Sequence, residues 1–136
     1  MSLPVQDNFF CSVLRCRAAR QLADLHDICG NDQTAKEYRA IVENISKHLS
    51  STFAHDSGLL KASTGKSAQA DVWGSAFAVY ADVLPKHDAK RISQAFLDAF
   101  TRGTIAWKSN IRHVPTDEDF SETSVWEDML PNFKKN

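Results

Sequence analysis

Apolar residues recur every three or four positions in four segments of the chain, the spacing that lines one face of an α-helix. The segments span about residues 8–29, 32–54, 71–84 and 88–103. Gly30-Asn31 separates the first two segments and Pro85 the last two, so each pair is joined by a short turn. Helices joined in this way lie antiparallel. The sequence therefore predicts an all-α fold of two antiparallel helical hairpins.

The same spacing predicts which face of each helix is buried. For the first helix this stripe is Phe10, Val13, Leu14, Ala18, Leu22, Leu25 and Ile28. For the second helix it is Tyr38, Ile41, Val42, Ile45, Leu49 and Phe53. Asp71 and Asp88 stand where the third and fourth helices begin, and each is expected to cap its helix by accepting a backbone hydrogen bond.

Short extended segments are expected between and after the hairpins. Residues 59–63 favour one strand, and residues 104–107 and 111–114 form two strand-like segments around Ser109-Asn110. Residues 114–133 carry six acids and no Lys or Arg, which predicts an acidic loop. We therefore expect one helical domain over residues 1–136, in which residues 104–136 supply a small β element and the acidic loop.

Length and charge exclude several classes of protein. The 136 residues suffice for one domain, and a net charge of −1 leaves no basic surface of the kind that nucleic acid requires. The longest apolar run, residues 76–81, is far shorter than the roughly 20 residues that span a bilayer. No signal sequence is visible at the N-terminus. We expect no nucleic-acid or membrane partner and a cytoplasmic location.

Metal and cofactor chemistry have little support in the sequence. His26 and Cys29 are three residues apart, but no second pair of Cys or His completes the four ligands of a zinc site. The three cysteines, Cys11, Cys16 and Cys29, are an odd number, as expected for free and mostly buried thiols. We expect no metal and no cofactor.

Tryptophan residues close to carboxylates are more informative. Trp73 follows Asp71 by two positions at a helix start, and Trp126 directly precedes Glu127 in the acidic loop. Indole rings stack on the apolar faces of sugars, and carboxylates bind hydroxyl groups or act as acid and base. The alternative is structural: Trp73 anchors the core, and the acids of the loop are a solvated surface.

Four pieces of the chain resemble one family. They are Gly58-Leu59-Leu60, Gln69-Ala70-Asp71-Val72-Trp73-Gly74-Ser75-Ala76-Phe77-Ala78, Gly103-Thr104-Ile105 and Ile111-Arg112-His113-Val114-Pro115. Together they are similar to part of the six-hairpin (α/α)6-toroid glycoside hydrolases, notably amylo-α-1,6-glucosidase-like members, over about residues 7–128. Ala70 departs from the family, which often has a proline there. Because the chain supplies only about four helices, the resemblance implies a C-terminal portion of such a toroid.

The resemblance implies an active site at one mouth of the toroid, where two carboxylates cleave a glycosidic bond without a metal. The candidate catalytic residues are then Asp71 and Glu127, and the candidate substrate-binding residues are Trp73, Arg112, His113 and Trp126. The tryptophans would be sugar platforms, while the Arg-His pair would bind hydroxyl groups or brace the loop. The expected substrate is an oligosaccharide or other glycoside. Since hairpins outside this chain can carry the second carboxylate, we expect weak or no turnover from the isolated chain.

A second class of function is a non-catalytic helical interaction module. Helices of an incomplete toroid would expose apolar faces that normally meet neighbouring hairpins, which favours a homo-oligomer. Such a module would be indifferent to sugars. A third class, a regulator that binds a small molecule between its helices, has no residue cluster of its own.

Overall fold

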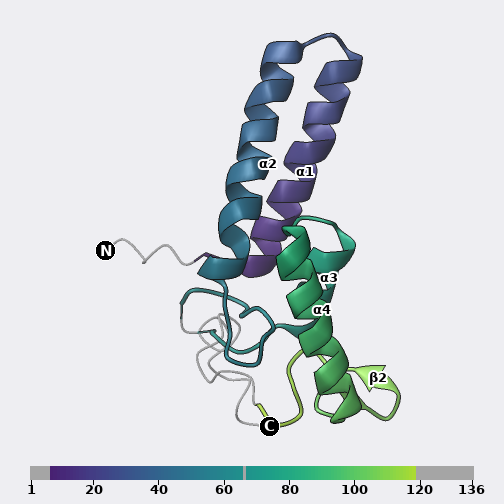
Figure 1. Ribbon diagram of the computed structural model, residues 1–136. Coiled ribbons are helices and arrows are strands. Elements are labelled where there is room, and N and C mark those ends of the chain that lie inside the picture. The colour runs from purple at the N-terminus through teal and green to yellow at the C-terminus, as the bar shows by residue number, and fades with distance from the viewer. Residues whose placement is uncertain (1–6, 66, 119–136) are drawn as a thin grey trace, which may run out of the picture.

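The computed structural model describes residues 7–65 and 67–118. Within these ranges the chain forms four helices and one two-stranded sheet (Figure 1), which are α1 (Phe9–Ile28), α2 (Asp32–Thr52), α3 (Val72–Tyr80), α4 (Lys86–Thr101), β1 (Ala106–Trp107) and β2 (Asn110–Ile111). The expected all-α fold of two helical hairpins with a small β element is confirmed in this coarse form. No helix in the described part is long and apolar enough to cross a membrane. Four helices alone do not distinguish a portion of a toroid from other hairpin folds.

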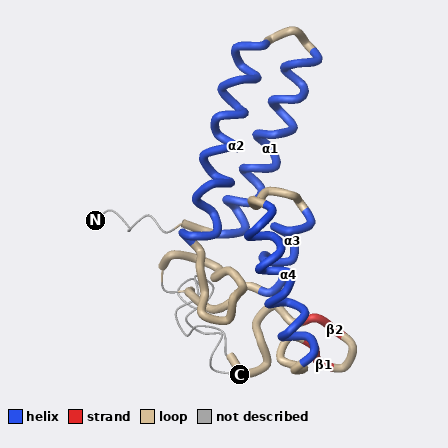
Figure 2. The backbone as a smooth tube through the Cα atoms, in the orientation of Figure 1, coloured by secondary structure: helices blue, strands red, loops and turns tan. Residues whose placement is uncertain are grey.

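The first hairpin, α1 and α2, stands out from the rest of the described chain (Figure 2). Asn8 caps α1, because its side chain accepts a hydrogen bond of 3.0 Å from the backbone N–H of Cys11. Gly30, with φ of +74°, begins the turn in a conformation that other residues rarely adopt. Near the turn, the Arg39 guanidinium on α2 pairs with Asp27 on α1. Local sequence signals thus define both ends of α1.

The buried face of α1 is not the predicted one. The structure buries Phe9, Val13, Cys16, Ala19 and Ala23, so only Val13 of the predicted stripe is buried. Leu14, Leu25 and Ile28 are instead 43, 56 and 82% exposed. Small side chains on the buried face let α2 approach α1 closely, so the larger apolar side chains point away from α2. The predicted stripe of α2 agrees more closely with the structure than that of α1 does. Its buried members are Leu49 and Phe53, and its half-buried members are Tyr38, Ile41, Val42 and Ile45.

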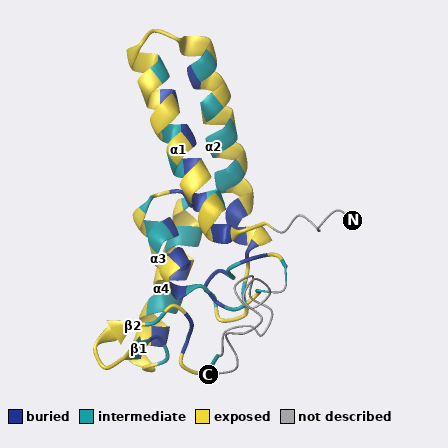
Figure 3. Cartoon of the chain, turned by 180° about the vertical axis from the view of Figure 1, so that it is seen from behind, coloured by how far each residue is buried: buried dark blue, intermediate teal, exposed yellow. Residues whose placement is uncertain are grey.

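The hydrophobic core lies at the base of this hairpin, where the start of α1 and the end of α2 meet the remaining elements (Figure 3). Phe9 and Phe53 pack there with their ring centroids 5.2 Å apart. The large, fully buried side chains also include Leu59, Leu60, Val72, Val83, Ile92 and Ile105. Apolar side chains from distant parts of the sequence therefore converge on one core.

Residues 59–63 do not form the predicted strand. They make isolated bridges instead, in which Leu60 pairs with Ala54, Lys61 with Ala70 and Ser63 with Asn8. Because each bridge has a different partner segment, no regular ladder develops. The segment is a buried loop that ties the end of α2 to the start of α1 and to the residues before α3.

The second hairpin, α3 and α4, differs from the prediction at its turn. α3 ends at Tyr80 rather than near residue 84, and Val83 and Leu84 are buried in the link. Pro85 occupies the N-cap position of α4, so the prediction that Asp88 caps this helix is wrong. Asp88 lies in the first turn instead, where its carboxylate faces the positive end of the helix dipole.

The small β element is shorter than predicted. Ala106 pairs with Ile111 and Trp107 with Asn110 in an antiparallel ladder. Lys108 and Ser109 connect the strands with φ of 45° and 67°, the left-handed backbone of a type I′ hairpin turn. The turn therefore lies one residue earlier than the sequence suggests, and the ladder does not include residues 104–105 or 112–114.

Candidate functional site

Asp71 is the N-cap of α3, as its position in the sequence predicts. Its Oδ1 accepts a hydrogen bond of 2.7 Å from the backbone N–H of Gly74. A Cβ atom added at Gly74 would collide with the Asp71 carboxylate, so only glycine leaves room for this cap. The distinctive Asp-x-Trp-Gly piece is thus explained by local geometry: the carboxylate lies directly over the first turn of the helix.

The carboxyl of Asp71 is shifted toward its protonated form relative to that of an exposed aspartate. Burial raises the pKa of this carboxyl above its ordinary value, while the Gly74 N–H and the charge of a protonated His113 act in the opposite direction. A carboxyl of this kind retains its proton to higher pH than an exposed aspartate does. It is therefore chemically suited to donate a proton to a bound group.

Trp73 projects from the first turn of α3 and stacks on His113. The ring centroids are 3.8 Å apart and the planes differ by 27°. The indole Nε1 donates a hydrogen bond of 3.0 Å to the carbonyl of Ile111, and the Val72 N–H donates one of 2.9 Å to the carbonyl of His113. Although it is held from one side, Trp73 remains 50% exposed. The expectation that Trp73 anchors the core is therefore wrong, because half of the residue faces solvent.

The structure brings together three of the candidate residues, Asp71, Trp73 and His113. Arg112 is next to His113 in sequence and half-buried, and its backbone N–H donates to the carbonyl of Ile105 at 2.9 Å. Trp126 and Glu127 lie outside the described residues. The two most distinctive pieces of the sequence, 71–74 and 111–115, therefore meet at the start of α3.

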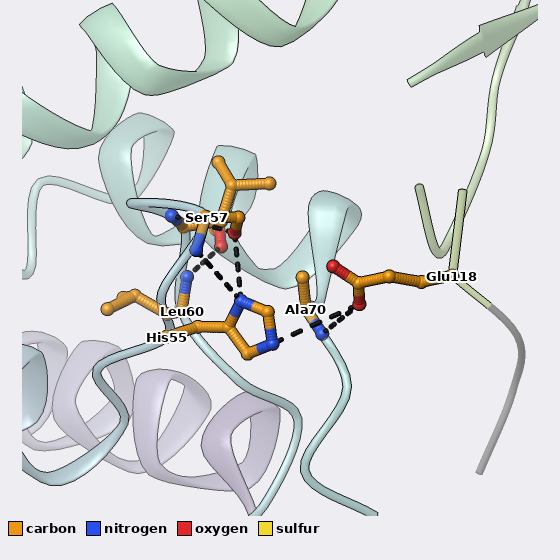
Figure 4. Close-up of polar contacts among 7 residues, drawn as sticks. His55, Ser57, Leu60, Ala70 and Glu118 are labelled. Atoms are coloured by element: carbon orange, nitrogen blue, oxygen red, sulfur yellow. Dashed lines mark hydrogen bonds and ion pairs between the residues drawn. The ribbon is translucent and has the colours of Figure 1, made fainter. Parts of the chain in front are cut away.

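A polar cluster that sequence reasoning missed lies beside this site (Figure 4). Glu118 Oε2 accepts a hydrogen bond of 3.2 Å from the N–H of Ala70, the residue before Asp71. The same oxygen lies 3.9 Å from Nε2 of His55. On the other side of the imidazole, Nδ1 lies 2.9 Å from the Ser57 hydroxyl and accepts a hydrogen bond from the Ser57 N–H at 3.2 Å. His55 therefore links a turn after α2 to the segment that precedes α3.

The order Ser57, His55, Glu118 superficially matches the nucleophile, base and acid of a hydrolytic triad. The backbone groups argue for a structural role instead. The Ser57 hydroxyl accepts a hydrogen bond from the Leu59 N–H, and the Gly58 N–H is bound to the carbonyl of His55. These two N–H groups are therefore not free to stabilise an oxyanion. The cluster braces the loop that carries Leu59 and Leu60 into the core.

The three cysteines lie on α1 or at its C-terminal cap. Cys16 is buried, but Cys11 and Cys29 are exposed, so the prediction of mostly buried thiols is wrong. No group of three or more His, Cys, Asp or Glu that could hold a metal occurs among residues 7–65 and 67–118. One cavity of about 330 Å³ lies between the helices of the first hairpin and is lined by polar residues that include Arg15, Asn44 and His48.

Comparisons with known proteins identify no family for this chain. No family model matches the chain, and neither a curated protein nor a solved structure matches it significantly. An assignment of function therefore rests on the residues of the site and on the sequence resemblance.

Proposed function

We propose that this chain is part of a carbohydrate-active enzyme, a glycoside hydrolase of the six-hairpin toroid type, and that Asp71 and Trp73 belong to its substrate site. The observation that carries the proposal is the pairing of a half-buried carboxyl with a half-exposed indole on one helical turn. Sugar recognition needs an apolar platform and an adjacent hydroxyl-binding or proton-donating group. Both groups are present here within three residues.

Trp73 is the sugar platform in this proposal. One face of its indole rests on His113, and its Nε1 is used by the Ile111 carbonyl, so the ring is held in one orientation. A platform that is fixed before the ligand arrives loses little conformational entropy on binding. The exposed part of the ring is then available to the apolar face of a pyranose.

Asp71 is the proton donor or hydroxyl-binding group in this proposal. Its raised pKa suits a general acid, which must be protonated before it meets the leaving oxygen. Hydrolysis also needs a second carboxylate to act as base or nucleophile. Glu127 or a residue from outside this chain has that role, and we expect weak or no turnover from the chain alone.

Binding is the decisive test, because it does not need the second carboxylate. Trisaccharides of glucose with α-1,4, α-1,6 or β-1,4 linkages would be titrated into the full chain by calorimetry. We expect one linkage to bind, and Trp73→Ala to weaken its binding at least about tenfold, which is about 1.4 kcal/mol. Trp107→Ala is the matched control, since Trp107 is 62% exposed and lies on β1.

Two outcomes would contradict the proposal. If the chain binds none of the three sugars, the carbohydrate site is absent. If Trp107→Ala weakens binding as much as Trp73→Ala does, the sugar binds elsewhere. Circular dichroism of each variant checks that its helices are intact.

A further inference from the structure

The outer face of α1 is an apolar seam that no other element covers within the described residues 7–65 and 67–118. We define this seam by residues that alternate at intervals of three and four along the helix: Cys11, Leu14, Ala18, Gln21, Leu25 and Ile28. All six are exposed, and Gln21 is the one polar member. The seam lies opposite the side chains that face α2, so α1 is apolar on two faces.

The spacing of the seam is that of a coiled-coil heptad. Apolar residues at alternating intervals of three and four occupy the a and d positions of a heptad, which pack against a second helix. Phe10 and Leu22 flank the seam and are 44% and 38% exposed. An exposed stripe of this length and composition is unusual on a helix that faces only water.

The seam is complementary to itself when two copies run antiparallel. With a two-fold axis midway between Ala18 and Gln21, Leu14 of one helix lies level with Leu25 of the other, and Cys11 with Ile28. Each core layer then joins an a position to a d position, as in antiparallel coiled coils. Ala18 lies level with Gln21, so the small side chain leaves space for the longer one.

The charges beside the seam favour the same arrangement. Arg17 and Asp24 are both g positions, and g positions face each other across an antiparallel pair. The antiparallel register therefore forms two Arg17–Asp24 ion pairs between the copies. In a parallel pair, g positions meet e positions, and Arg17 would face Leu22 instead. Arg17 and Asp24 thus face each other across the helix pair only when the helices are antiparallel.

Both charged residues are accessible in the structure. The Arg17 guanidinium lies over the ring of Phe77 at 5.9 Å and is only partly covered. The Asp24 side chain is 64% exposed, with its carboxylate 3.7 Å from Arg39. We propose that a second copy of this chain covers the seam, so that the protein is a homodimer through antiparallel α1 helices.

The native mass of the full chain tests this directly. Light scattering over a range of concentrations is expected to give the mass of two chains. The double substitution Leu14→Gln with Leu25→Gln should give one chain, because it removes both leucines from each of the two Leu14–Leu25 layers of the dimer. Leu97→Gln with Phe100→Gln is the matched control on α4, since these residues are 56% and 54% exposed and lie off the seam. The control should remain dimeric.

Charge reversal tests the orientation of the two helices. Arg17→Glu should weaken the dimer about tenfold, because each copy then places Glu opposite Asp24. Adding Asp24→Arg should restore the affinity by exchanging the two charges. A melting curve confirms that each variant is folded. A single-chain mass for the unmodified protein overturns the proposal, and so does a dimer that survives the double seam substitution; failure of the charge rescue overturns the antiparallel register.

The proposed homodimer does not depend on the carbohydrate site. The seam is on α1, while Asp71 and Trp73 are at the start of α3. A dimer that binds no sugar would reject the proposed function alone, and a monomer that binds sugar would reject the homodimer alone.

Discussion

The first hairpin and the lobe formed by residues 53–118 have similar helical spacing but bury different kinds of side chain. Along most of its length the hairpin buries small residues, namely Cys16, Ala19, Ala23 and Ala35. The lobe buries large ones, including Leu59, Leu60, Ile92 and Ile105. Periodicity thus predicts that a helix forms, whereas the neighbouring element decides which of its apolar faces is buried.

The largest expected effect is in the lobe. Leu60 is fully buried, so Leu60→Ala should lower the free energy of unfolding by about 2–5 kcal/mol through lost contacts and a cavity. Leu97→Ala is the control, and a 56% exposed leucine should lose less than about 1 kcal/mol. Urea unfolding measures both. Equal losses would mean that Leu60 is not a core residue.

In the hairpin, the expected damage comes from enlarging a side chain rather than shortening it. Ala23 is 1% exposed between α1 and α2, so Ala23→Leu should cost about 1–3 kcal/mol by forcing the helices apart. Ala40→Leu adds the same atoms at an exposed position of α2 and should be nearly neutral. If Ala23→Leu is as well tolerated as its control, the two helices are not closely packed there. Urea unfolding again provides the measurement.

The cap of α3 should contribute less. Asp71→Ala removes the acceptor of the Gly74 N–H and should cost about 1 kcal/mol, within the range of about 0.5–2 found for N-caps. Asp71→Asn keeps an acceptor oxygen and should retain most of this stability. Unfolding curves at one pH distinguish the two. A loss that is equal in both variants would show that the charge, not the cap, stabilises the helix.

The smallest effect is the pH dependence that Asp71 confers. Because its pKa is raised in the folded chain, the native state holds this proton more tightly than the unfolded state does. The stabilisation is complete below the ordinary value of 3.8 and is lost as pH rises through the raised pKa. Relative to Asp71→Asn, the natural chain should therefore become less stable over that interval. A natural chain that became more stable relative to Asp71→Asn as pH rises would contradict this sign.

Much of the fold follows from the sequence for local reasons. Asn8 and Asp71 cap their helices as short polar side chains do, and Gly30 and Pro85 mark the turns. The buried face of α1 does not follow, because Phe9 and Phe10 are adjacent and both are apolar. Only the close approach of α2, which requires small side chains, selects the face with Ala19 and Ala23.

The candidate site, like the fold, is only partly predicted by the sequence. Asp71 and Trp73 are predicted from their place at a helix start, and the resemblance pairs them with His113. The sequence does not predict the pairing of His55 with Glu118, because this contact depends on how the loop after α2 folds back beside Ala70. The sequence shows the loop signal Asp56-Ser57-Gly58 but does not select one of six acids as its partner.

The hydrogen bonds that residues 70–73 make with residues 111–118 also set an order of assembly during synthesis. The first hairpin is held by contacts within one continuous stretch and is complete once residue 52 has emerged. Trp73 depends on a carbonyl 38 residues further along, and the Ala70 N–H on a carboxylate 48 residues away. Distant contacts form more slowly than local ones. On the ribosome, α1 and α2 therefore fold first, and the candidate site is completed only after Glu118 has emerged.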